Sequence, residues 1–351
     1  MKEKKLYADM NKILTLLIII FIIFQPGYAG EDFFLSYSSI KAKPIAMGGA
    51  YSAVEDNFVS ATYNPASLNL YETEKSFRIT LFLNPIAPLI SFYEQHKTPS
   101  AGPVQTNENQ HYLKNAATFF KGLVITTKFL DIGFIFNEQT IDSAKLVEQK
   151  QVFEQPAIWS NCYHSAIIRL KLADRVSLGV SASLFYDGTD EEFSHDYGFG
   201  YGLLIKPTQK LNVGMTYNYM PQLMSDIRMP LERLVDQTIN IGLAFFPFRG
   251  ATLSFDLRNV TEEKGKSVVE AHFGFEQQLF SMIALRCGYF KERFVPNHTY
   301  SMGIGLVDSN FLFSKENKLI QPQFWFNYAL ALQRHANQTS CWHVISFNIR
   351  L

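Results

Sequence analysis

The chain has 351 residues, and its 32 Lys and Arg balance 32 Asp and Glu, so the formal net charge is zero. A neutral chain lacks the basic footprint that neutralises phosphates, which argues against a nucleic-acid partner. The mean hydropathy of −0.03 excludes a bundle of membrane helices, while the 15% aromatic content is typical of β-sheet proteins, soluble sandwiches and membrane barrels alike.

The N-terminus has the pattern of a secretory signal peptide. Lys2, Lys4, Lys5 and Lys12 precede an apolar run over 13–24, and the small residues Gly27 and Ala29 occupy the −3 and −1 positions of a cleavage site. Twelve apolar residues are too few for a helix that spans a bilayer, which takes about 20. The sequence therefore predicts a signal peptide over 1–29, cleavage after Ala29 and export of the chain.

After a mixed segment over 30–75, the sequence changes to period-2 alternation. Leu211, Val213 and Met215 alternate with Asn212 and Gly214, and the same pattern holds over 176–184, 239–245 and 252–258. Alternation of apolar with small or polar residues predicts strands with one apolar face. Strands of about ten residues favour a tilted crossing of a bilayer over a soluble sandwich.

Fourteen such strands are predicted, in an antiparallel transmembrane β-barrel over 76–351. Their ranges are 76–94 (with a kink at Asn84-Pro85), 117–128, 130–138, 162–173, 175–187, 196–206, 210–220, 236–246, 250–258, 267–278, 281–291, 298–307, 321–333 and 340–351. Tight turns alternate with longer loops at 95–116, 139–161, 187–196, 221–236, 259–266 and 291–298, and 308–320 is a long exception. An even count with short turns on one side places both ends of the barrel in the periplasm.

No catalytic, metal or cofactor motif is found, and we expect no enzyme. Six residues form an acidic cluster between two strands: Asp187, Asp190, Glu191, Glu192, His195 and Asp196. Oxygen ligands suit Ca²⁺, but the spacing of a calcium loop is missing, so we interpret the cluster as a solvated loop. Gly198, Gly200 and Gly202 open no helix, which excludes a dinucleotide site and predicts small lumen-facing residues or a bend. Cys162, Cys287 and Cys341 give neither a disulfide framework nor a metal motif.

The most specific segment runs from Lys41 through Ala-Met-Gly-Gly-Ala and an acidic pair to Asn64-Pro65-Ala66. It resembles the N-terminal motif of the FadL-like outer-membrane transport proteins, including the PorV-type and spirochaetal barrels. The matching residues are Met47, Gly48, Gly49, Ala50, Asn64, Pro65 and Ala66. A second resemblance is the glycine-rich strand and Pro-containing turn over 197–208, followed by the strand that returns over 211–217. The resemblance implies a barrel in the bacterial outer membrane, of the fourteen strands counted above, with residues 30–75 as a lumenal plug, or hatch.

The resemblance implies passive, hatch-gated transport of hydrophobic, fatty-acid-like molecules. The alternative is a PorV-type barrel that binds secreted proteins or secretion-machinery partners. The expected partners are outer-membrane lipid, a hydrophobic small molecule and the outer-membrane assembly machinery, whose signal the alternating terminal strand resembles, although Leu351 replaces the usual Phe. Substrate-contacting residues cannot be carried over from the motif.

Overall fold

The computed structural model describes residues 33–36, 40–56, 58–68, 77–86, 88, 119–139, 162–189, 192–219, 237–263, 266–279, 283–291, 298–306, 323–335 and 338–351. The predicted signal peptide over 1–29 lies outside these ranges. Within them, no helix is long and apolar enough to cross a membrane.

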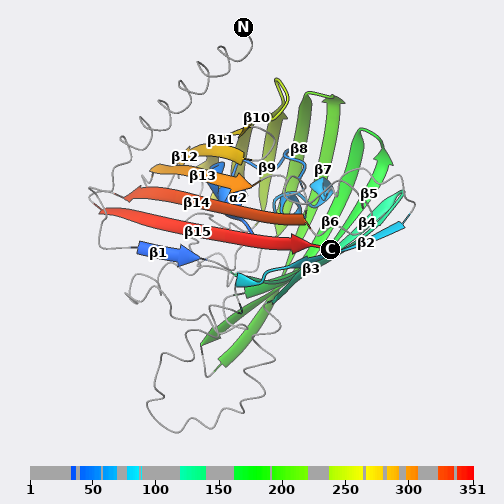
Figure 1. The fold of residues 1–351 in the computed structure, drawn as a ribbon, viewed down its shortest axis with the longest axis horizontal. Helices are drawn as coiled ribbons and strands as arrows, with labels where there is room; N and C mark the ends of the chain where they lie inside the picture. Colours follow the sequence, from blue (N-terminus) through cyan, green and yellow to red (C-terminus); the bar gives the residue numbers. More distant parts are fainter. Residues whose placement is uncertain are drawn as a thin grey trace.

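Fourteen antiparallel strands, β2 to β15, pair in chain order, and β15 pairs back with β2 to close a barrel (Figure 1). The strands are β2 (Phe77–Leu83), β3 (Phe120–Thr127), β4 (Leu130–Gln139), β5 (Cys162–Ala173), β6 (Val176–Thr189), β7 (Glu192–Thr208), β8 (Leu211–Tyr219), β9 (Thr238–Phe245), β10 (Ala251–Glu263), β11 (Lys266–Leu279), β12 (Ile283–Lys291), β13 (His298–Leu306), β14 (Gln323–His335) and β15 (Gln338–Arg350). Each predicted strand corresponds to one of these, so the predicted fold class and strand count are confirmed.

The predicted facing of the strands is also confirmed. In β9, Thr238, Asn240, Gly242 and Ala244 are buried inside the barrel, while the residue after each of them is exposed. In β10, Leu253 is 45% exposed and Ser254 only 5%. Soluble proteins have a mainly polar outer surface, whereas a barrel in a bilayer requires an apolar one, as found here.

Two of the predicted long loops are wrong. β6 and β7 pair as far as Thr189 and Glu192, and β10 and β11 pair as far as Glu263 and Lys266, so only two residues join each pair. Polar residues in these stretches mask the strand pattern. Their backbone groups are nevertheless satisfied by continuing the ladder.

The first barrel strand is shorter than predicted. β2 ends at Leu83. The N–H of Asn84 still donates to the Phe119 carbonyl at 2.7 Å, but its side chain turns the chain by accepting a hydrogen bond from the backbone N–H of Ile86 at 3.1 Å. Pro85, which has no N–H, follows this turn and cannot donate to a ladder. The kink predicted at Asn84-Pro85 is therefore where the strand terminates.

A further strand, β1 (Phe33–Ser36), was not predicted; it lies parallel to β15. The chain then forms α2 (Ala42–Ala46) and the 3₁₀ turns η1 (Ser60–Thr62) and η2 (Pro65–Ser67). Residues 40–56 and 58–68, here called the inner segment, contact inward-facing residues of strands from β2 to β15, as detailed below.

Candidate functional site: the lumen and its inner segment

Gly48 and Gly49 let the inner segment lie directly on the barrel wall. Both have positive φ, 63° and 72°, a conformation that L side chains rarely adopt. The N–H of Gly48 donates to Ser301 Oγ at 3.1 Å, and its carbonyl accepts from Nδ1 of His272 at 2.6 Å. A Cβ on Gly48 would lie 2.7 Å from the backbone nitrogen of Tyr289. This pair of glycines therefore turns the chain within backbone contact of β11 and β12.

Asn64, Pro65 and Ala66 form a second contact, on β6 and β7. The Asn64 side chain accepts from the Ala66 N–H at 3.0 Å, capping η2, and its amide donates to the carbonyls of Ser52 at 2.8 Å and Leu203 at 3.1 Å. Pro at the first position of the turn needs no N–H partner there. The Ala66 carbonyl accepts from Ser177 Oγ at 2.8 Å. Asn64 thus joins the inner segment to itself and to the wall.

Glycines of the wall receive these backbone atoms. A Cβ on Gly202 would collide with Asn64 Oδ1, and one on Gly179 with the peptide between Pro65 and Ala66. These two glycines are register partners on β6 and β7. The pairs Gly214–Gly242 and Gly274–Gly288 likewise face Ser52-Ala53 and Met47-Gly48. Gly198, Gly200 and Gly202 are buried and face inward, as predicted. Gly202, like the paired glycines, lies where the backbone of the inner segment approaches the wall.

The other motif residues are buried within the same region. Met47 and Ala50 have no exposed surface, and Met47 packs in a cluster with Tyr51, Tyr63 and Ala244. Burial and the adjacent Asp56 carboxylate raise the pKa of Tyr51 well above its usual value. The phenol is therefore protonated and donates to Asp56 Oδ2 at 2.8 Å.

Carboxylates of the wall bind backbone N–H groups and a lysine of the inner segment at several points. Asp256 of β10 accepts the N–H groups of Tyr51 at 2.9 Å and Ser52 at 2.8 Å through one oxygen, Oδ2. Lys43 lies 3.0 Å from Asp56 of its own segment and 3.4 Å from Glu276 of β11. These buried lumenal charges were missed in the sequence, although Asp256 stands on the polar face of a predicted strand.

The two ends of the inner segment are fixed to β4 and β5. Glu138 follows a β-bulge in which Asn137 has φ of 50°, and both its carboxylate oxygens accept the N–H of Ile40, at 3.1 and 3.2 Å. At the other end, Arg169 donates to the carbonyl of Leu68 at 2.5 Å and to Glu55 at 2.9 Å.

Between these charged contacts the segment meets β2 to β5 through apolar side chains. Phe58 packs on Phe82 with ring centroids 3.9 Å apart, and Phe82 stacks on Trp325 of β14 at 6.2 Å. The cluster contains Ile40, Phe58, Val59, Ala61, Leu68, Phe82, Val124, Ile135 and Ile167. We call this the apolar side of the lumen, and the paired glycines with Asp256 on β6 to β12 the glycine side.

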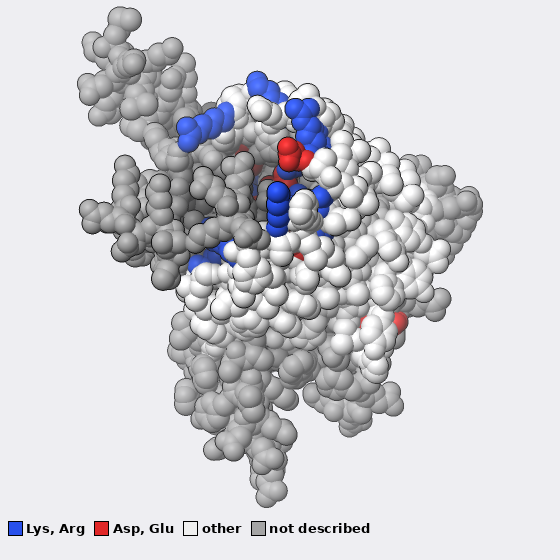
Figure 2. Space-filling model, turned by 90° about the vertical axis from the view of Figure 1, so that its right-hand side faces the viewer, with Lys and Arg blue, Asp and Glu red and all other residues white. Residues whose placement is uncertain are grey.

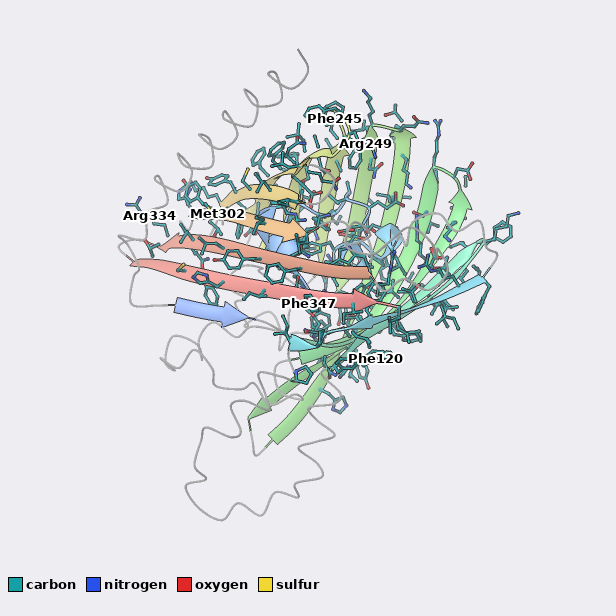
Figure 3. All side chains as sticks on the ribbon, viewed as in Figure 1. Phe120, Phe245, Arg249, Met302, Arg334 and Phe347 are labelled. Atoms are coloured by element: carbon teal, nitrogen blue, oxygen red, sulfur yellow. The ribbon has the colours of Figure 1, made fainter. Side chains whose placement is uncertain are left out.

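Basic residues lie around the end of the barrel where β3 joins β4, β5 joins β6, β7 joins β8 and β9 joins β10, which is also the end of the C-terminus. They are Lys128, Lys171, Arg175, Lys206, Lys210 and Arg249, here called the basic collar. Figure 2 looks onto this end and shows Lys and Arg around a hollow, with acidic side chains deeper inside. Phe245 and Arg249 mark the same end in Figure 3. Lys206 forms an ion pair with Glu55, which connects the basic collar to the inner segment.

The acidic cluster does not form a recognisable metal site in the described residues. Asp187 and Glu192 lie in β6 and β7, and Asp190 and Glu191 lie outside the described residues. Across the part of the chain that the structure describes, no three His, Cys, Asp or Glu side chains gather as metal ligands. Cys287 and Cys341 are free thiols.

No protein-family model matches the chain, and no curated protein matches it. Similar solved structures include the CymD monoaromatic hydrocarbon channel, at 11% identity and a TM-score of 0.44, over 88% of this chain and 95% of that one. A FadL homologue of Pseudomonas aeruginosa has 10% identity and a TM-score of 0.43, over 92% of this chain and 99% of that one. A mutant porin of Rh. blastica has 8% identity and a TM-score of 0.34, over 66% and 77%.

These similarities are too low to transfer a residue role or a substrate. The architecture rests on the chain's own geometry. The strands pair into a closed antiparallel barrel, and its apolar residues face outward, as a bilayer requires. The chain is a closed antiparallel β-barrel whose apolar outer surface suits a membrane.

Proposed function

We propose that this barrel conducts hydrophobic small molecules of the fatty-acid type across the outer membrane by passive diffusion, and that its N-terminal residues gate the passage as a plug. The observation that carries the proposal is the difference between the two sides of the lumen. The inner segment is bonded to the glycine side, whereas its contact with β2 to β5 includes a continuous apolar cluster.

The glycine side is unsuited to passage. Its contacts place backbone against backbone, and separation would leave Asp256 and the N–H groups of Tyr51 and Ser52 without their bonds. An unpaired buried polar group costs about 1 to 3 kcal/mol, and more when it is charged. The segment is therefore expected to stay on this side and to exclude water and ions.

The apolar side can separate at lower cost. Phe58, Val59 and Phe82 meet through dispersion contacts, so a hydrophobic molecule that inserts between them replaces one apolar neighbour with another. Glu138 and Arg169 hold the two ends of the segment beside this cluster, so only the apolar contacts between those ends separate. Such a path selects hydrocarbon chains over hydrophilic solutes of similar size.

The basic collar suits a substrate with an anionic end. Lys210 and Arg249 are exposed in turns between strands at this end, and opposite charges attract across about one Debye length, roughly 8 Å at physiological salt. A fatty-acid carboxylate leaving the lumen would meet these cations. This supports an amphiphilic substrate over a neutral hydrocarbon.

The proposal is tested by uptake into intact cells that lack their own fatty-acid transporter. Expression of the wild-type protein is expected to accelerate uptake of radiolabelled oleate and leave uptake of a radiolabelled disaccharide unchanged. Mass spectrometry of the detergent-purified barrel is expected to find co-purified lipid. Oleate uptake equal to that of cells without the protein, together with a lipid-free lumen, would overturn the proposal.

A further inference from the structure

Three basic side chains form one row on the outer wall of the barrel, at the end opposite the C-terminus. Lys291 of β12 is the register partner of His298 of β13, and His298 is the register partner of Arg334 of β14. Their chain neighbours Phe290 and Thr299 are buried inside the barrel, so the three side chains face outward. Figure 3 shows Arg334 at this end. We call these three residues the basic row.

The basic row has no acidic partner among the described residues. Lys291 and Arg334 are exposed, and neither forms an ion pair with a described carboxylate. On β15, the register partner of Arg334 is the neutral Thr339. Residues 292–297, which join β12 to β13 outside the described ranges, contain one Glu and one Arg and add no net charge. Like charges on neighbouring positions of a sheet repel each other, and an anion bound between them offsets this cost.

Two tyrosines lie one step below the basic row. Tyr289 pairs with Tyr300, and their ring centroids are 5.2 Å apart. The Tyr289 hydroxyl lies 2.9 Å from Nδ1 of His298, and this bond orients the imidazole without using Nε2. In the tautomer in which the hydroxyl donates to Nδ1, Nε2 carries the proton and can donate to a phosphate oxygen. Outward tyrosines near strand ends are typical of the boundary between hydrocarbon and water.

Below the tyrosines the same wall is apolar. Cys287 and Met302 are register partners, and Leu285 and Ile304 follow one step further from the strand ends. Met302 is labelled in Figure 3, and Ile304 is 44% exposed. From the strand ends inward, the wall therefore presents cations, then phenols, then hydrocarbon. A membrane lipid has the complementary order, with a phosphate at the surface and acyl chains below it.

From this arrangement we infer that the basic row binds the phosphate-bearing headgroup of an anionic lipid, whose acyl chains lie on the apolar wall below the tyrosines. Neighbouring strands lie about 4.8 Å apart, so Lys291 and Arg334 stand about 10 Å apart across β13, and their long side chains can converge on one headgroup. The Arg334 guanidinium can bind two phosphate oxygens, and Lys291 adds a point charge. The site lies on the outer wall, separate from the lumen, and goes beyond the proposed passage.

The exposed thiol of Cys287 gives a local readout of this site. A fluorophore is attached to Cys287 in the full chain, with Cys162 and Cys341 replaced by Ser. Lipids with brominated acyl chains quench the fluorophore only on close approach. The labelled barrel, purified in detergent, is titrated with brominated dioleoyl phosphatidic acid. A second titration uses phosphatidylcholine with the same chains, whose headgroup has no net charge.

Phosphatidic acid is expected to quench the wild-type barrel at a lower concentration than phosphatidylcholine does. Each Lys or Arg near an anionic lipid strengthens binding about fivefold. Lys291→Gln with Arg334→Gln is therefore expected to weaken quenching by phosphatidic acid about 25-fold, toward the level of phosphatidylcholine. The matched control, Lys291→Arg with Arg334→Lys, keeps both charges and should keep the preference. The gel mobility of unheated samples verifies that each barrel is folded.

Equal quenching of the wild-type barrel by the two lipids would overturn the inference, and this comparison requires no variant of the basic row. A preference for phosphatidic acid that persists in the folded glutamine variant would also overturn it. Inorganic phosphate, added at the concentration of the lipid, is expected to leave the quenching unchanged. If inorganic phosphate displaces phosphatidic acid as effectively as unbrominated phosphatidic acid does, the basic row binds the free anion and the lipid assignment is wrong.

Discussion

The two sides of the lumen hold the same inner segment in different ways. On the glycine side, its backbone lies against wall backbone at Gly179 and Gly202, and Asp256 accepts two of its N–H groups. On the apolar side, Phe58 and its neighbours meet Phe82 and Ile167 through side chains alone. Contacts that require an exact backbone approach anchor a segment, whereas side-chain contacts between hydrocarbons tolerate exchange. The difference predicts a fixed plug with a hydrophobic path beside it.

The largest expected effect comes from filling one of the glycine positions. Gly202→Val would place a side chain into Asn64 and Ala66, and we expect a cost of about 3 kcal/mol, at the upper end for overpacking. The barrel should assemble with the inner segment displaced. Sensitivity of intact cells to a large hydrophilic antibiotic measures the resulting leak.

Gly200→Val is the matched control, two residues along the same inward face. A Cβ there meets the Ser181 hydroxyl at 2.5 Å and the Asn218 side chain, but no atom of the inner segment. Only Gly202→Val should leak. Equal leakage by the two variants would show that strand packing, and not the inner segment, closes the lumen.

An effect of similar size is expected from Asp256→Ala. This change removes the acceptor of two buried N–H groups, and hydrogen bonds to charged groups contribute about 1.5 to 3 kcal/mol each. Limited proteolysis of the purified protein should cut within 40–68 faster than in wild type. Ser254→Ala, on the same face, is the control, because the Ser254 hydroxyl has no hydrogen-bond partner among the described residues; equal protection of both variants would contradict the anchoring role.

The apolar side is probed by exchanging one methyl-bearing group for a hydroxyl. Ile167→Thr places a polar atom in the apolar cluster, at about 1 kcal/mol or somewhat more for the lost hydrocarbon contact. We expect slower uptake of radiolabelled oleate. The reciprocal control is Thr216→Val on β8, also buried, which should leave uptake unchanged. If Thr216→Val alone changes uptake, the path runs along the glycine side.

The smallest effect is expected at the basic collar. Lys210→Ala with Arg249→Ala should weaken an exposed charge attraction by about 0.2 to 1 kcal/mol. Oleate uptake should slow modestly at low ionic strength, and uptake of its neutral methyl ester should not. Arg334→Ala, exposed at the other end of the barrel (Figure 3), is the control. An equal decrease in uptake of the ester would show that the basic collar does not attract the substrate through its charge.

Period-2 alternation was sufficient to predict the strands and their facing, because a bilayer outside and a packed lumen inside impose opposite polarity on successive residues. β1 escaped prediction because a four-residue parallel pairing depends on the edge that β2 leaves. The lumenal ion pairs escaped for a related reason. Arg169 and Glu55 lie 114 positions apart, and only closure of the barrel brings them together.

The turns formed by the motif residues were easier to predict than the wall residues that they contact. Gly48, Asn64 and Pro65 could be read as residues that permit tight turns, which they are. Their bonds to Ser301, His272 and Leu203 could not be read from the chain. A motif specifies the local backbone, whereas the wall atoms that it meets are set by strand register.

The central claim is that hydrophobic molecules pass while the inner segment stays on the glycine side. The most direct test joins the two with a disulfide between Ala66→Cys and Ser177→Cys, positions already joined by the 2.8 Å hydrogen bond from the Ser177 hydroxyl to the Ala66 carbonyl, with the native cysteines replaced by Ser. The account predicts that the oxidised protein takes up radiolabelled oleate as fast as its reduced form. Loss of uptake on oxidation, reversed by reduction, would contradict it and show that the whole inner segment must leave.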